Sequence, residues 1–222
     1  DLHSFPTRRS SDLEITGMDE AYNMASELVA VTEDMEIEAE AERILGEYWY
    51  QKGDYAKAAD LLTSYLATGH SQDKRYDTYL LGISEFQTGQ TDRALEHLSE
   101  VVRDDDALTQ NALLHMGLAS LSKGDSNSAR LSFERASNIP GKSDIREQAL
   151  YNYAMVIHET SYSPFAESVT SFERFLNEFP GSAYADKVSS YLVDAYMNTT
   201  SYDAALASIA KIQNPGASIL IS

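Results

Sequence analysis

Three triplets, each of two glycines and one alanine, recur in register along the chain. The spacing within each triplet is seven and then five residues, and successive triplets begin 36 and then 35 residues apart. The triplets are Gly46, Gly53 and Ala58; Gly82, Gly89 and Ala94; and Gly117, Gly124 and Ala129. A period of this length indicates stacked supersecondary units that bury their apolar faces against one another rather than in one closed core. The sequence therefore predicts a repeat architecture.

Each triplet lies within two helical patterns that a short turn joins. In residues 39–72, Leu45, Tyr48 and Trp49 recur at helical spacing before Gly53, and a second apolar series follows that glycine. A glycine inside a helix costs roughly 1 kcal/mol relative to alanine, so its recurrence in first helices needs a compensating gain. We expect each first glycine to face the alanine of its own triplet and so to let the two helix axes approach closely.

These positions resemble the tetratricopeptide repeat (TPR), a family pattern of Leu-Gly, an aromatic residue, Gly-Asp-Tyr, alanine, an aromatic residue and a second alanine. The residues that carry the resemblance are Leu45, Gly46, Trp49, Gly53, Asp54, Tyr55, Ala58 and Leu62; Leu81, Gly82, Phe86, Gly89, Ala94 and Leu98; Gly117, Gly124, Asp125, Ala129, Phe133, Ala136 and Pro140; and Leu192, Tyr196, Tyr202, Ala205, Ile209 and Ile212. A looser fourth repeat has Ala154 for the glycine and Ser168 for the alanine. The resemblance implies an all-α fold, a right-handed superhelical solenoid of stacked helix-turn-helix units.

The resemblance also divides the chain. The five repeats are expected at about residues 39–72, 75–108, 110–143, 147–182 and 186–212. Residues 14–38 are expected to hold the second helix of a truncated repeat, marked by Ala21, Ala25 and Leu28, and a connector, while 213–222 are expected to begin a further truncated repeat. Residues 1–13 have no apolar periodicity and resemble a translated sequencing adapter, so we interpret them as a non-native scar on a metagenomic fragment.

The charge of the chain is strongly negative. It holds 35 acidic and 17 basic residues, a formal net charge of -18, and no cysteine. Binding to nucleic acids and anionic lipids depends on clustered Lys and Arg, so this composition disfavours both. No apolar run approaches the roughly 18 residues of a membrane-spanning helix. The acidity suits a solvated surface, with selection of basic partners as the alternative.

Sequence motifs of catalysis and metal binding are absent. The chain has no Gly-x-Ser-x-Gly, no His-Glu-x-x-His and no phosphate-binding glycine loop. The histidines His70, His97, His115 and His158 lie in different repeats without ligand spacing, and we expect them at the surface or in packing. Asp104 to Asp106 fall in an expected turn and lack the alternating oxygen ligands of a calcium loop. We therefore predict a protein that is not an enzyme and needs no cofactor or metal.

The concave surface of stacked repeats is lined by their first helices, and solenoids bind partners there. The family's groove positions fall on Arg43, Glu47, Tyr50, Tyr76, Tyr79, Ile83, Phe86, Leu114, Leu118, Leu121, Tyr151, Met155, His158, Asp194 and Met197. The aromatic members suit binding hot spots because they bury a large area and keep a polar handle. Packing between repeats is the alternative for the aliphatic members and for Tyr50, Tyr79 and Tyr151. The Lys and Asn with which family members clamp acidic carboxyl-terminal tails are absent, which disfavours such tails.

Residues 172–185, FERFLNEFPGSAYA, resemble a signature of bacterial cell-envelope TPR proteins. These include lipoproteins of outer-membrane β-barrel assembly, the periplasmic partner of the Tol-Pal system and large periplasmic TPR proteins of the Bacteroidetes type. The resemblance implies a scaffold that binds an extended peptide or partner helix, in the periplasm or at the outer membrane, with the cytoplasm as the alternative location. A recruiting arm of a larger enzyme and a spacer or self-association module are the alternative functions. The sequence identifies neither the partner nor the oligomeric state.

Overall fold

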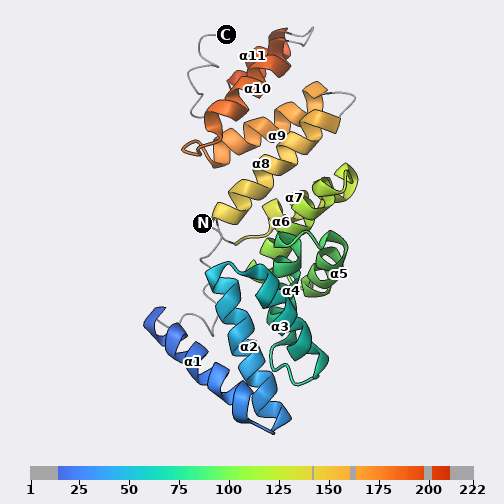
Figure 1. Ribbon diagram of the computed structural model, residues 1–222. Coiled ribbons are helices and arrows are strands. Elements are labelled where there is room, and N and C mark those ends of the chain that lie inside the picture. The colour runs from blue at the N-terminus through green and yellow to red at the C-terminus, as the bar shows by residue number, and fades with distance from the viewer. Residues whose placement is uncertain (1–14, 142, 161–163, 198–201, 211–222) are drawn as a thin grey trace. The chain divides into compact units, whose positions relative to one another are not determined.

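The computed structural model describes residues 15–141, 143–160, 164–197 and 202–210 (Figure 1). Within these residues every regular element is an α-helix. The helices are α1 (Ile15–Val31), α2 (Met35–Lys52), α3 (Tyr55–Ala67), α4 (Lys74–Gln87), α5 (Thr91–Val101), α6 (Ala107–Ser122), α7 (Ser126–Asn138), α8 (Ser143–Thr160), α9 (Pro164–Glu178), α10 (Ala185–Met197) and α11 (Tyr202–Ile209). The chain divides into two compact units, of which unit 1 ends at Arg103 and unit 2 begins at Asp104.

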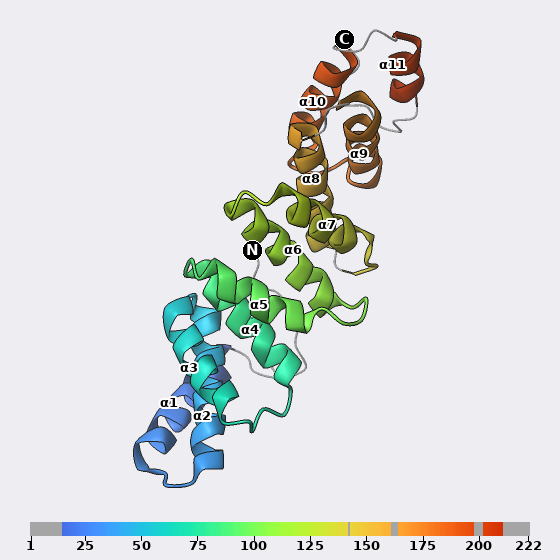
Figure 2. The ribbon, with the colours of Figure 1, turned by 90° about the vertical axis from the view of Figure 1, so that its right-hand side faces the viewer.

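Unit 1 consists of two helix hairpins and one additional helix. The hairpins are α2 with α3 and α4 with α5, and α3 packs on α4 to join them (Figures 1 and 2). Helix α1 lies alongside α2 and packs chiefly on it. The expected connector is shorter than predicted, because α2 already begins at Met35, where Asp34 caps the helix by accepting the backbone N–H groups of Glu36 and Ile37.

Unit 2 repeats the same plan. Helix α6 forms a hairpin with α7, α8 forms one with α9, and α7 packs on α8 between them. Helix α10 then packs on α9. Residues 1–13, 161–163 and 213–222 lie outside the described residues, as do the side chains of Met197 and Ala205.

The turns inside three hairpins are built from a left-handed glycine and the residue that follows it. The glycines are Gly53 (φ 78°), Gly89 (φ 79°) and Gly124 (φ 76°). Such a φ suits glycine at the end of a helix because glycine has no Cβ. The following residues Asp54 and Asp125 cap α3 and α7 through their carboxylates, whereas Gln90 makes no capping hydrogen bond at α5. The predicted turn is thus confirmed.

The glycines inside the first helices pack against a different residue from the one predicted. A Cβ built at each position would meet Leu62 Cγ 3.0 Å from Gly46, Leu98 Cγ 2.9 Å from Gly82 and three ring atoms of Phe133 within 2.7 Å of Gly117. Each large side chain follows the alanine of the triplet by four residues, one helical turn. The alanines Ala58, Ala94 and Ala129 are buried, but the expected glycine–alanine pairing was wrong by that turn. Close approach of the two helices is confirmed.

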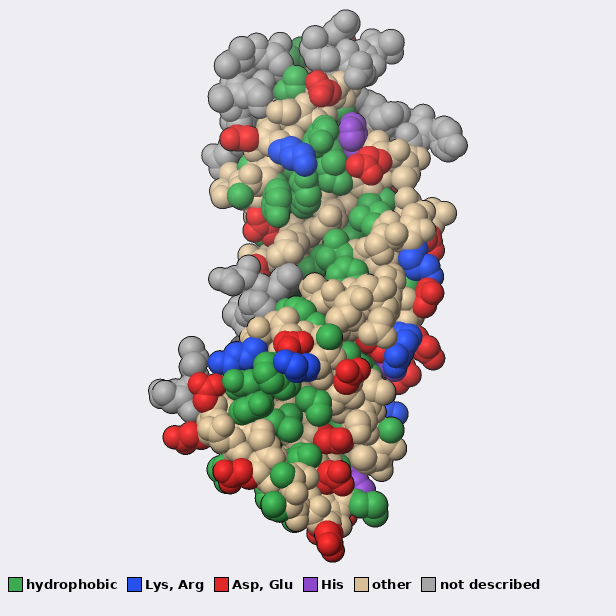
Figure 3. Space-filling view, in the orientation of Figure 1, with side chains coloured by type: hydrophobic (Ala, Val, Ile, Leu, Met, Phe, Trp, Pro, Cys, Tyr) green, Lys and Arg blue, Asp and Glu red, His purple; other side chains and the backbone are tan. Residues whose placement is uncertain are grey.

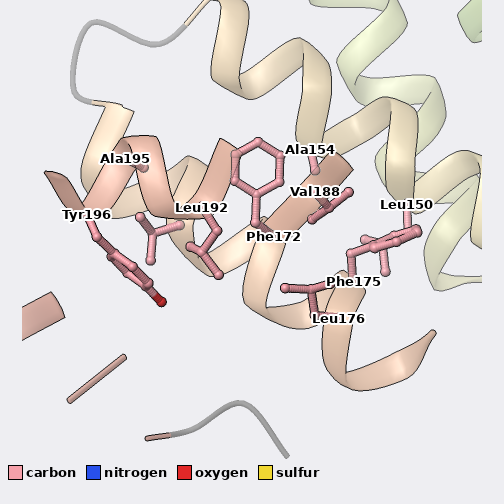
Figure 4. Close-up of a cluster of buried hydrophobic side chains, with 10 residues drawn as sticks. Leu150, Ala154, Phe172, Phe175, Leu176, Val188, Leu192, Ala195 and Tyr196 are labelled. Atoms are coloured by element: carbon pink, nitrogen blue, oxygen red, sulfur yellow. The ribbon is translucent and has the colours of Figure 1, made fainter. Parts of the chain in front are cut away.

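One core cluster of unit 2 lies between α8, α9 and α10 (Figure 4). Phe172 and Phe175 of α9 are fully buried among Leu150 and Ala154 of α8 and Leu192 of α10. Ala154 holds the place of the repeat glycine, as the sequence predicted, and Ser168 is buried at the alanine position. Because these side chains of α8 and α10 point into the core, the other faces of the two helices lie outside it.

An aromatic cluster joins α1 to α2 in unit 1. The ring centroids of Tyr22 and Tyr48 are 4.4 Å apart in a stacked arrangement, and the ring of Trp49 meets that of Tyr22 edge-on at 5.7 Å. The ammonium of Lys57 lies 3.8 Å from the centroid of the Trp49 ring. Trp49 is thus held by contacts on both sides.

Candidate functional site

The predicted groove positions of unit 1 form a buried polar network between α2 and α4. Arg43 donates hydrogen bonds to Glu40, with Nη2 2.6 Å from Oε1, and to Glu47, with Nη1 3.0 Å from Oε2. The hydroxyl of Tyr76 on α4 donates to Glu47 Oε1 at 3.4 Å. Arg43 and Glu47 are both buried, although charged residues seldom are unless they are paired.

The protonation behaviour of this network follows from burial and pairing. Burial alone would lower the pKa of Arg43, but the hydrogen bond to Glu40 and the charges of Glu40, Glu47 and Asp77 raise it. Burial raises the pKa of Glu47, and Arg43 and the Tyr76 hydrogen bond only partly oppose that rise. Arg43 therefore stays charged and holds the carboxylates in place.

Tyrosines extend the network along the same two helices. The rings of Tyr76 and Tyr79 stack with centroids 6.4 Å apart. Burial raises the pKa of Tyr50 to about 12, an effect that a hydrogen bond from Tyr79 partly offsets. The Tyr79 side chain is only 2% exposed, so it offers a partner almost no surface. Arg43, Glu47, Tyr76 and Tyr79 thus hold α2 against α4, and a binding role for them stays a prediction.

The predicted aliphatic positions are mostly in packing. Ile83 and Leu114 are buried, and Leu118 and Leu121 are partly buried. Their burial agrees with the alternative that the sequence left open for them.

The predicted positions on α8 and α10 of unit 2 are more open than those on α6. Tyr151, Met155 and His158 of α8 are partly exposed, and Asp194 of α10 is exposed. Tyr151 stacks on Tyr184 with ring centroids 4.3 Å apart. His158 lies 5.1 Å from the ring of Tyr191, centroid to centroid.

Three residues of this surface were missed by the sequence prediction. Tyr184 is 39% exposed, Tyr191 is partly exposed, and the ammonium of Lys187 lies 5.7 Å from the Tyr151 ring and 5.9 Å from the Tyr191 ring. Tyr184, Lys187, Tyr191 and Asp194 follow one another at intervals of three, four and three residues. This spacing puts them on one face of α10 and of the residue that precedes it. That spacing was a usable signal in the sequence.

We call the partly exposed side chains Tyr151, Met155, His158, Tyr184, Lys187 and Tyr191 the aromatic surface. They come from α8, from α10 and from the residue before α10. Figure 3 shows hydrophobic side chains gathered over this part of unit 2, with a basic side chain and a histidine beside them. The surface offers ring faces for apolar contact and a cation at its centre.

Comparison with known proteins identifies the repeat. Residues 19–73 and 79–143, more than half of the chain, match the family model described as tetratricopeptide repeat. The chain belongs to the tetratricopeptide repeat family. No curated protein matches it. Among solved structures, the crystal structure of MamA protein is similar to it with a TM-score of 0.58 and 18% sequence identity, over 78% of this chain and 89% of that one.

The TPR assignment and the likeness to MamA confirm an all-α solenoid fold. TPR domains bind proteins or peptides, which makes an interaction scaffold the function class of this chain. At 18% identity the likeness to MamA shows the fold alone.

The histidines of this TPR protein have separate surroundings. His70 is exposed, His97 Nδ1 lies 2.6 Å from Glu85 Oε2, and buried His115 contacts the carbonyl oxygen of Asn111. Over the residues with described positions, no group of three or more His, Asp or Glu side chains could hold a metal ion. The same residues include no helix long and apolar enough to cross a membrane.

Proposed function

We propose that this TPR protein is a non-enzymatic scaffold that binds an extended peptide or a partner helix on the aromatic surface of unit 2. The observation that carries the proposal is the partial exposure of Tyr151, Tyr184 and Tyr191 around Lys187. Side chains of this kind dominate binding energy because they bury much area at a small entropic cost. Of the predicted positions in unit 1, Arg43, Glu47, Tyr76 and Tyr79 are buried, and only Tyr50 and Phe86 are partly exposed, so unit 2 is the better candidate.

The partner that this surface suits carries apolar side chains and a carboxylate. Ring faces accept aliphatic and aromatic groups, and Lys187 can pair with an acidic group that enters between Tyr151 and Tyr191. Nucleic acid is a poor partner because the net charge of -18 opposes contact with phosphates.

A role in the bacterial cell envelope is the second part of the proposal. It is supported by the likeness of residues 172–185 to envelope TPR proteins. Within that segment Phe172 and Phe175 are core residues, while Tyr184 belongs to the aromatic surface. The test is to fractionate cells that express the gene. A periplasmic or outer-membrane fraction supports the proposal, and a cytoplasmic one removes it.

The binding test selects peptides from a random library on the folded protein and measures their affinity for variants. We expect Tyr151→Ser with Tyr184→Ser to weaken binding by about tenfold or more, because two rings leave the surface. The control is Leu131→Ser on α7, which removes an exposed side chain elsewhere in unit 2. Tyr79 is unsuitable for this purpose since its loss would disturb the core of unit 1. Unchanged affinity in the double variant would leave a spacer as the better function.

A further inference from the structure

Helix α1 carries an apolar stripe that faces solvent. Met24 is 65% exposed, Leu28 40% and Val31 77%. Their spacing of four and then three residues puts them on one face of the helix. Met35 and Ile37, at the start of α2, continue the exposed apolar region at 73% and 43%. We call Met24, Leu28 and Val31 the α1 stripe.

A different face of α1 already serves the packing of unit 1. Ala25 is buried against Ala41 and Leu45 of α2, and Tyr22 stacks on Tyr48. Since each residue advances about 100°, Tyr22 lies about a third of a turn or more from every residue of the α1 stripe. Ala25 lies about 100° from Met24 but only about 60° from Leu28, which therefore borders the packing face. The α1 stripe is therefore additional to the face that holds α1 in place.

Helix α3, also in unit 1, is an example of a helix whose apolar side chains are covered by neighbouring helices. Helix α3 packs on α2 and also on α4, and Ala58, Ala59 and Leu62 are all buried. Helix α1 has α2 as its chief neighbour. Because helices pack through stripes of this spacing, the α1 stripe is shaped for another helix.

Charge indicates the chemistry of that helix. Residues 15–42 hold nine Asp or Glu residues and no Lys or Arg. Glu20 and Glu27 are exposed, and their spacing of seven residues puts both along the same edge of the α1 stripe. A second copy would bring acidic edge against acidic edge, which costs binding free energy. A partner with basic residues would gain instead.

We propose that the α1 stripe docks an amphipathic helix that carries Lys or Arg beside its apolar face. The apolar contacts supply affinity, and Glu20 and Glu27 select the basic edge of the partner. This goes beyond the aromatic surface, because the stripe lies in unit 1 and recognises a partner of different chemistry. The two sites can be disabled separately.

The test uses a synthetic peptide of about 18 residues, close to the length of α1, with Leu at helical spacing and Lys along both edges. A control peptide has Glu in place of every Lys. Fluorescence anisotropy with the full chain should show binding of the Lys peptide at least about tenfold tighter than that of the Glu peptide, and weakening with added salt. Equal affinity for the two peptides overturns the proposal.

Variants assign the binding to the stripe. Met24→Gln with Leu28→Gln should weaken the Lys peptide by about tenfold, and Glu20→Gln with Glu27→Gln should reduce the salt dependence. Leu131→Gln, at an exposed leucine in unit 2, should change neither. All of these side chains are exposed, so circular dichroism should report intact folding. Retained affinity in the Met24 and Leu28 variant overturns the proposal, as does a dimer in sedimentation that this variant dissociates, because a second copy would then occupy the stripe.

Discussion

The first-helix surfaces of the two units use the same repeat in different ways. In unit 1, Arg43 and Glu47 of α2 and Tyr76 of α4 are buried and bonded to one another. In unit 2, Tyr151 of α8 and Tyr191 of α10 keep part of their rings exposed. A position in the repeat thus determines which way a side chain points but does not determine whether a neighbour covers it.

The difference lies in the partners that each side chain finds. A charged Arg43 requires carboxylates within hydrogen-bond reach once it is buried, and Glu40 and Glu47 supply them. The hydroxyl of Tyr76 in turn donates to Glu47. In unit 2, Tyr151 stacks on Tyr184 and Tyr191 stacks on the core residue Phe172, and both Tyr151 and Tyr191 keep part of their rings exposed. A closed network stabilises its unit, whereas an open aromatic surface is available to a partner.

The largest effect should come from breaking the network of unit 1. Arg43→Met leaves the buried Glu47 carboxylate without its cation, so we expect the free energy of unfolding to fall by about 3 kcal/mol. The matched change in unit 2 is Lys187→Met, at an exposed cation, and should have little effect on stability. Denaturant titration of both variants measures the contrast. Equal losses would mean that the two surfaces do not differ as described.

The close contact between paired helices should tolerate an added methyl group less well at Gly117 of unit 2 than at Gly82 of unit 1. Gly117→Ala puts a methyl group against the rigid ring of Phe133, and we expect a loss of about 2 kcal/mol. Gly82→Ala would meet Leu98 Cγ at 2.9 Å and the Leu98 backbone nitrogen at 3.3 Å, a looser fit than at Gly117, and it gains helix propensity, so its loss should be smaller, about 1 kcal/mol. Gly181→Ala, with open space around its Cβ, is the control. Thermal unfolding should rank the three in this order.

The two units should respond oppositely to acid. Burial lowers the pKa of His115 in unit 2 below its ordinary 6.5, so below pH 6.5 the unfolded chain binds a proton that the folded unit does not, and stability falls. Burial raises the pKa of Glu47 in unit 1, so its contribution to stability falls as pH rises from 4.5 through its folded pKa. His115→Gln should reduce the loss of stability between pH 6.5 and the folded pKa, while His70→Gln at an exposed site should not. Denaturant titrations of the variants at a series of pH values below 6.5 test this prediction.

The smallest effect concerns the hairpin turns. Asp125 caps α7 in unit 2, while Gln90 leaves α5 of unit 1 without a side-chain cap. Gln90→Asp should therefore stabilise unit 1 by about 0.5 to 1 kcal/mol. Gln90→Ala is the comparison that separates the new cap from the loss of the glutamine. A melting temperature no higher than that of Gln90→Ala would contradict the prediction.

The turns and hairpins could be predicted because their causes are local. A glycine such as Gly53 allows a left-handed φ, and the carboxylate of Asp54 caps α3 by accepting the backbone N–H of Lys57, only three residues later. The burial of Tyr79 could not be predicted in this way, since it depends on side chains from another helix. The glycine contact was misplaced by one turn for the same reason: Leu62 reaches Gly46 across the interface, past the predicted Ala58.

The candidate site was only partly predictable. Tyr151, Met155 and His158 followed from the repeat positions, and they lie on the aromatic surface. Tyr184 precedes α10 and Lys187 lies in its first turn, where the family pattern marks no groove position, so the prediction passed over them. Reading α10 for its own helical spacing would have found both.

The position of Trp49 gives unit 1 an optical report of its own. It is the one tryptophan of the sequence, and it lies in unit 1 between Tyr22, Tyr48 and Lys57. Indole emission therefore follows unit 1 alone, while far-ultraviolet circular dichroism follows the helices of both units. Units that unfold independently will give two midpoints by these probes, and units that unfold together will give one.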